Sequence, residues 1–178
     1  MNIYKRLFLA TVIPFGIIMG ICLMFQYGFL GFVAGLFGGI FYGGFMSLIL
    51  GSLHIWSVKR ISYRKSKDIT NVRHSRNIEL QLSYDKAFNL CIESLKIFKK
   101  YKIKEENYSY GKIVAITGMT WKSWGEVISF DVHKTDNNRI QIIISSKPVL
   151  PTTLVDYGKN LENVERIVAF LKEKSEVI

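Results

Sequence analysis

The N-terminal third of the chain contains two long apolar runs without a charged side chain. Residues 7–25 and residues 28–53 are each long enough, at 1.5 Å per helical residue, to cross a hydrocarbon core of about 30 Å. Because only Gln26 and Tyr27 separate them, the sequence predicts a tight hairpin of two transmembrane helices within residues 1–56. The first run is longer than the apolar part of a signal peptide, and no A-x-A cleavage site follows it, which favours a retained span.

Basic side chains flank both runs and set the expected orientation. Lys5 and Arg6 precede the first run, and a basic linker at residues 57–76 follows the second. Cytoplasmic flanks of membrane helices are enriched in Lys and Arg. We therefore expect a multi-pass protein of the inner (plasma) membrane with both termini in the cytoplasm. The residues expected at the membrane surface are Trp56, Lys59, Arg60, Arg64, Lys65 and Lys67.

The charge of the chain is divided unevenly. Residues 1–78 carry nine basic side chains against one acidic side chain, whereas residues 79–178 carry fifteen against thirteen. Such an asymmetry is typical of chains that meet a membrane or a nucleic acid. The neighbouring apolar runs favour the lipid bilayer as the partner, and no nucleic-acid partner is expected.

Small residues recur at every fourth position of the second run. Residues four apart share one face of a helix, and small side chains let two helix backbones approach closely. The repeating residues are Gly31, Gly35, Gly39, Gly43, Ser47 and Gly51, and the first run contributes Gly16 and Gly20. This spacing resembles the glycine zipper of many membrane proteins. The face either packs against the first run of the same chain or joins subunits, and we expect a homo-oligomer.

Residues 77–178 have the pattern of a small α+β domain, expected on the cytoplasmic side. Apolar residues at every second position predict strands at 77–84, 102–109, 113–119, 126–134 and 139–146. Helical spacing predicts helices at 83–100 and 161–174, with Ser83 and Asn160 as N-caps. The order β-α-β-β-β-β-α favours a mostly antiparallel sheet with the helices on one face.

The sequence shows no motif for catalysis or cofactor binding. It has no phosphate-binding glycine loop, no HExxH and no GxSxG, and its two cysteines and three histidines form no metal-binding spacing. We therefore expect no enzyme, no cofactor and no metal. Two loops are candidates for a recognition surface that binds a protein or a lipid, through Trp121, Lys122, Trp124, Asp156, Tyr157 and Lys159. The alternative for the two tryptophans is that they fill the end of the sheet core.

The prediction for function is a self-associating integral membrane protein without enzymatic activity. It would present its small cytoplasmic domain as a binding or scaffold module to a cytoplasmic protein. One alternative is a small homo-oligomeric channel with the glycine-rich helix around its axis, although the apolar runs offer no charge to select an ion. The other is a membrane-anchored sensor that holds a lipid or metabolite between the sheet and the final helix.

Overall fold

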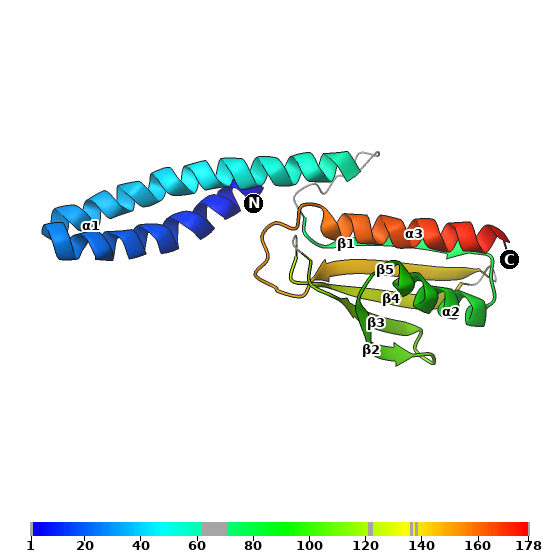
Figure 1. The fold of residues 1–178 in the computed structure, drawn as a ribbon. Helices are drawn as coiled ribbons and strands as arrows, with labels where there is room; N and C mark the ends of the chain where they lie inside the picture. Colours follow the sequence, from blue (N-terminus) through cyan, green and yellow to red (C-terminus); the bar gives the residue numbers. More distant parts are fainter. Residues whose placement is uncertain (1, 62–70, 121–122, 136, 138, 178) are drawn as a thin grey trace. The chain divides into compact units, whose positions relative to one another are not determined.

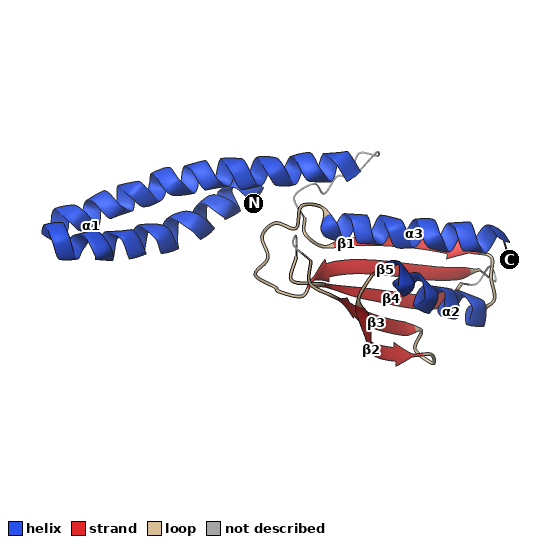
Figure 2. Ribbon diagram, in the orientation of Figure 1, coloured by secondary structure: helices blue, strands red, loops and turns tan. Residues whose placement is uncertain are grey.

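The computed structural model describes residues 2–61, 71–120, 123–135, 137 and 139–177. The chain divides into two compact units, residues 1–70 and residues 71–178. Each unit is described by itself (Figures 1 and 2).

The first unit is a single helical element, α1 (Ile3–Ile61), that is interrupted at Gly28. Gly28 has φ 61° and ψ −147°, a conformation that glycine adopts without the steric cost of a side chain. The chain reverses there, and the two arms of α1 run back along each other (Figure 1). The sequence prediction of two separate helices divided at Gln26 and Tyr27 is therefore wrong, because both residues are helical and the helix continues past residue 53.

The second unit is an α+β domain with one five-stranded antiparallel sheet, in the spatial order β1-β5-β4-β3-β2. This confirms the predicted α+β class and the order of strands and helices. The elements are β1 (His74–Leu80), α2 (Tyr84–Ser94), the 3₁₀ turn η1 (Leu95–Ile97), β2 (Tyr101–Asn107), β3 (Lys112–Thr117), β4 (Glu126–Lys134), β5 (Ile140–Pro148) and α3 (Lys159–Val177).

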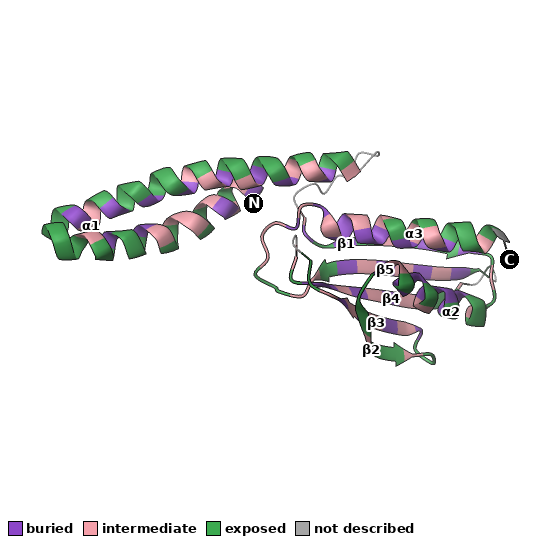
Figure 3. Ribbon diagram, in the orientation of Figure 1, coloured by how far each residue is buried: buried purple, intermediate pink, exposed green. Residues whose placement is uncertain are grey.

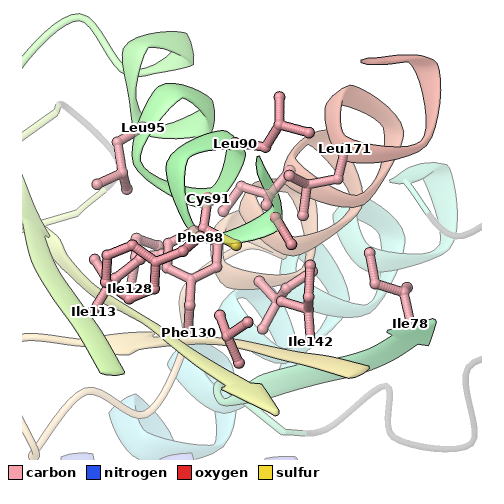
Figure 4. Close-up of a cluster of buried hydrophobic side chains, with 14 of the residues drawn as sticks. Ile78, Phe88, Leu90, Cys91, Leu95, Ile113, Ile128, Phe130, Ile142 and Leu171 are labelled. Carbon is pink, nitrogen blue, oxygen red and sulfur yellow. The ribbon is translucent and has the colours of Figure 1, made fainter. Parts of the chain in front are cut away.

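The core of the domain lies between α2, α3 and one face of the sheet (Figure 3). Alternate residues of β3, β4 and β5 are buried, as the period-two pattern requires. Phe130 and Ile142 from the sheet meet Cys91 of α2 and Leu171 of α3 in one apolar cluster (Figure 4). Burial in this cluster raises the pKa of the Cys91 thiol to about 12.

Candidate functional site

The small residues of α1 lie between its two arms. Gly16, Gly20, Gly31, Gly35, Gly39, Gly43, Ser47 and Gly51 are all buried. A Cβ atom added to Gly39 would lie 2.5 Å from the Cα of Gly16, and one added to Gly35 would collide with the backbone of Gly20. The arms thus meet backbone to backbone, which only glycine permits at these positions. We call this buried face the glycine face.

Larger side chains support the contact between the arms on either side of the glycine face. The rings of Phe15 and Tyr42 stack with their centroids 4.1 Å apart. Near the open end of the hairpin, the hydroxyls of Tyr4 and Ser52 lie 3.4 Å apart. The predicted helix-packing residues are therefore used within one chain.

The outward side of α1 is strongly apolar. Phe25 and Phe41 are 83% and 82% exposed, and other phenylalanine, leucine and isoleucine side chains along both arms are exposed too. A Cβ atom added to Gly38 or Gly44 would meet nothing within 4 Å, so these two glycines lie outside the glycine face. By its length and composition, α1 is able to cross a membrane.

The basic end of α1 is described as far as Ile61. Lys59 and Arg60 lie in its last turn, where cations are favoured by the helix dipole. The guanidinium of Arg60 lies 5.6 Å from the ring centroid of Trp56, which is largely exposed. Arg64, Lys65 and Lys67, which the sequence also assigns to a membrane surface, lie outside the described residues.

In the α+β domain, both candidate recognition loops lie at one end of the sheet. Thr117 ends β3, Glu126 begins β4 opposite Pro148 of β5, and His74 at the start of β1 pairs with Ser146. The segment in which the chain enters the domain therefore shares this end with the two loops. We call it the entry end, defined by residues 71–74, 98–101, 117–120, 123–126 and 147–160.

A buried carboxylate holds the loop between β3 and β4. Glu126 is 1% exposed, and its Oε2 accepts a hydrogen bond of 2.6 Å from Thr117 Oγ1, while Ser123 Oγ donates to Oε1. In return, the Glu126 amide donates to Thr117 Oγ1 at 2.9 Å, and the Gly125 amide donates to Ser123 Oγ at 3.0 Å. The carboxylate is satisfied by hydroxyl groups of its own loop, so its role is to fix the backbone there.

A second buried carboxylate fixes the start of α3. Asp156 accepts hydrogen bonds from the amides of Gly158 and Asn160, at 3.1 and 2.9 Å, and from Asn160 Nδ2 at 2.8 Å. The preceding turn has positive φ at Tyr157 (51°) and Gly158 (75°). Ser83 caps α2 as predicted, but the prediction that Asn160 caps the last helix is wrong. Asn160 lies inside α3, and Asp156 binds the free amides in its place.

A pocket of about 290 Å³ lies between the two loops. Trp124, Glu126, Leu150, Leu154, Asp156 and Asn160 are among the residues that line it. Both carboxylates in its wall already accept hydrogen bonds from the protein, so they frame the pocket and leave its apolar side chains to meet a partner. Among the described residues, no group of three or more His, Cys, Asp or Glu side chains is placed to hold a metal ion.

The structure separates the predicted recognition residues into different roles. Trp124 is 70% exposed and does not fill the end of the sheet core. Asp156 is buried, Tyr157 is half-buried, and Lys159 lies 3.4 Å from the carboxylate of Glu162. Trp121 and Lys122 lie outside the described residues.

Sequence reasoning missed two apolar side chains of the entry end. Met119 is 70% exposed beside the loop of Trp124, and Leu150 is exposed in the loop after β5. Both residues stand in segments already recognised as loops, where an apolar side chain has no core to join. That signal was present in the sequence and was not used.

No protein-family model and no curated protein matches this chain. Three solved structures are distantly similar. TTHA0849 from Thermus thermophilus is 8% identical, with a TM-score of 0.41, over 59% of this chain and 97% of that chain. The ZhuI aromatase/cyclase from Streptomyces sp. R1128 is 16% identical, with a TM-score of 0.35, over 59% and 86%. Ara h 8.0201 is 12% identical, with a TM-score of 0.28, over 57% and 99%. At these identities and TM-scores, neither an activity nor a ligand carries over to this chain.

Proposed function

We propose that this protein is a membrane-anchored binding module, in which α1 inserts into a bilayer as a helical hairpin and holds the α+β domain at the cytoplasmic surface. The observation that carries the proposal is the inverted packing of α1. Its arms bury glycine against glycine and expose large apolar side chains such as Phe25 and Phe41. In water, an exposed apolar surface of that extent would drive aggregation, whereas in lipid it is the expected outer surface.

The distribution of charge supports the cytoplasmic placement. Lys5 and Arg6 lie near the start of α1, and Lys59 and Arg60 lie in its last turn, so both ends of the hairpin are basic. The reversal at Gly28 is uncharged. This arrangement matches the positive-inside rule for a hairpin whose tip faces away from the cytoplasm.

We do not propose a channel or a sensor. In α1 the small side chains that would surround a central axis pack against the other arm of the same hairpin. For a sensor, a ligand would have to fit between the sheet and α3. There Phe130, Ile142, Ile167 and Leu171 pack together and are almost completely buried.

The proposal is tested by labelling single cysteines in intact cells with a membrane-impermeant maleimide. In a Cys22→Ala chain, we compare Tyr27→Cys, at the reversal, with Lys174→Cys, on the exposed side of α3. We expect Tyr27→Cys to react in intact cells and Lys174→Cys to react only after permeabilisation. The Cys22→Ala chain alone is the control, because Cys91 is buried and its raised pKa keeps the thiol protonated.

Two results would overturn the proposal. Extraction of the protein from membranes by alkaline carbonate would exclude a spanning hairpin. Labelling of Lys174→Cys in intact cells would place the α+β domain on the outer side.

A further inference from the structure

The entry end of the α+β domain exposes three large apolar side chains on two different loops. Trp124 and Met119 are each 70% exposed, and Leu150 is 42% exposed. The pairing of Glu126 with Pro148 brings these loops to the same end of the sheet. The hydrogen bonds of Glu126 with Thr117 and Ser123 hold the first loop in place, so Trp124 is presented on a fixed backbone.

The exposed charges around these side chains are all basic among the described residues of the entry end. They are Arg73, Lys99, Lys100 and Lys147. The acidic residues Glu126 and Asp156 are buried and hydrogen-bonded within the protein. This end therefore presents apolar side chains within a ring of positive charge, which matches an anionic lipid surface.

The opposite end of the domain differs in its charges. There Arg139 pairs with Glu79 at 3.6 Å, and Asp85 lies in the first turn of α2. Tyr110 is 78% exposed in the turn between β2 and β3. The opposite end thus has an exposed aromatic ring without the uniformly positive surroundings, and Tyr110 provides a matched control.

The covalent connection to α1 also favours the entry end. Nine residues, 62–70, separate Ile61 at the end of α1 from Asn71. Fully extended, nine residues span about 30 Å at most. If α1 is in a bilayer, the entry end is the part of the domain that this short connection keeps close to the lipid surface, at a high effective concentration.

We propose that the entry end docks onto the anionic surface of the same membrane that holds α1. Trp124, Met119 and Leu150 insert at the boundary between headgroups and acyl chains, and the surrounding lysine and arginine side chains meet the lipid phosphates. Tryptophan is favoured at this depth because its ring is apolar and its N–H group bonds to polar neighbours. This inference rests on the proposed function, and the two are tested separately in one experiment.

The experiment uses three full-length chains, each with a single tryptophan, in vesicles of equal parts phosphatidylglycerol and phosphatidylcholine. Lipids brominated near the top of the acyl chains quench a tryptophan that reaches them. The first chain keeps Trp56 (Trp121→Phe, Trp124→Phe) and reports on insertion of α1. The second keeps Trp124 (Trp56→Phe, Trp121→Phe) and reports on docking. The third replaces all three tryptophans by phenylalanine and carries Tyr110→Trp at the opposite end.

We expect Trp124 to lose as large a fraction of its fluorescence as Trp56, and the tryptophan at position 110 to lose none. Adding Lys100→Glu and Lys147→Glu to the Trp124 chain should abolish the loss at Trp124. The same two substitutions in the Trp56 chain should leave its quenching unchanged. Vesicles of phosphatidylcholine alone should reduce the quenching of Trp124 and spare that of Trp56.

The possible failures are distinguishable. Quenching of Trp56 without quenching of Trp124 would overturn the docking inference, keep the membrane anchor and leave the entry end for a protein partner. Equal quenching at positions 110 and 124 would overturn a specific docking face. Absence of quenching at Trp56 would overturn the membrane anchor itself, and the docking inference with it.

Discussion

Asp156 shows at the scale of one residue how a buried carboxylate supports the entry end. It accepts hydrogen bonds from two backbone amides and one side-chain amide at the start of α3. Asn160, its partner, also accepts a hydrogen bond of 2.6 Å from Ser146 in β5. Asp156 therefore joins the loop to α3 and, through Asn160, to the sheet.

We predict that Asp156→Ala lowers the free energy of unfolding of the α+β domain by about 3 kcal/mol, because it leaves buried donors without acceptors. Glu162→Ala is the control. Glu162 lies one turn further along α3 in a partly exposed ion pair with Lys159, and removing it should cost less than about 1 kcal/mol. Urea unfolding of the full chain in detergent micelles, followed by the β-sheet signal in circular dichroism, measures both. Equal costs for the two substitutions would contradict a capping role for Asp156.

The sequence identified Asp156 and Trp124 as unusual but could not assign their roles. Asp156 reaches the amides of α3 because Tyr157 and Gly158 both adopt positive φ, and this turn is not visible in the sequence pattern. Trp124 is exposed because the hydrogen bonds of Glu126 fix its loop away from the core. Both outcomes depend on contacts between residues that single-residue properties do not specify.

At the scale of elements, local periodicity predicted the strands and helices of the domain well. Strands at 126–134 and 139–146 closely match β4 and β5, because alternation between a buried and an open face is a strong signal. The boundaries were less accurate. β1 begins at His74 rather than at 77, since pairing with Ser146 of β5 extends it. α2 ends at Ser94 and continues only as the 3₁₀ turn η1.

The glycine face of α1 shows what periodicity leaves open. Spacing by four predicts a close contact, but it does not say whether the partner is the same chain or another chain. The contact of Gly39 with Gly16 settles the partner within this structure. The position of the reversal also escaped the sequence, because several glycines of this region could have adopted the positive φ of Gly28.

We predict that Gly39→Leu destabilises the hairpin by about 2 kcal/mol or more, because the new side chain would enter the backbone of the facing arm. Gly38→Leu is a matched control one residue away, since a Cβ atom there meets nothing within 4 Å. The midpoint of unfolding by sodium dodecyl sulfate, measured by helical circular dichroism in mild detergent, should fall for Gly39→Leu only. If Gly38→Leu lowers the midpoint as much, the arms do not pack through the glycine face.

At the scale of the whole molecule, the intrachain use of the glycine face bears on self-association. The sequence prediction of a homo-oligomer depended on that face being available to a second chain. In the structure, its small residues are buried between the arms of α1, and the outward side presents large apolar side chains that lipid can cover. We therefore expect the protein to be a monomer in mild detergent, as measured by native mass spectrometry after removal of the detergent in the gas phase.

A closed oligomer of a single stoichiometry would contradict this expectation and would require an association surface other than the glycine face. The outward glycines Gly38 and Gly44 would then be the first positions to vary, because each leaves room for a neighbouring helix. Loss of that oligomer in Gly44→Leu, with an unchanged unfolding midpoint, would assign association to the outward side. Loss of the oligomer together with a lower midpoint in Gly39→Leu would instead show that hairpin formation precedes assembly. In both cases the two functions of glycine in α1, folding one chain and joining several, would be assigned to different faces of the same helix.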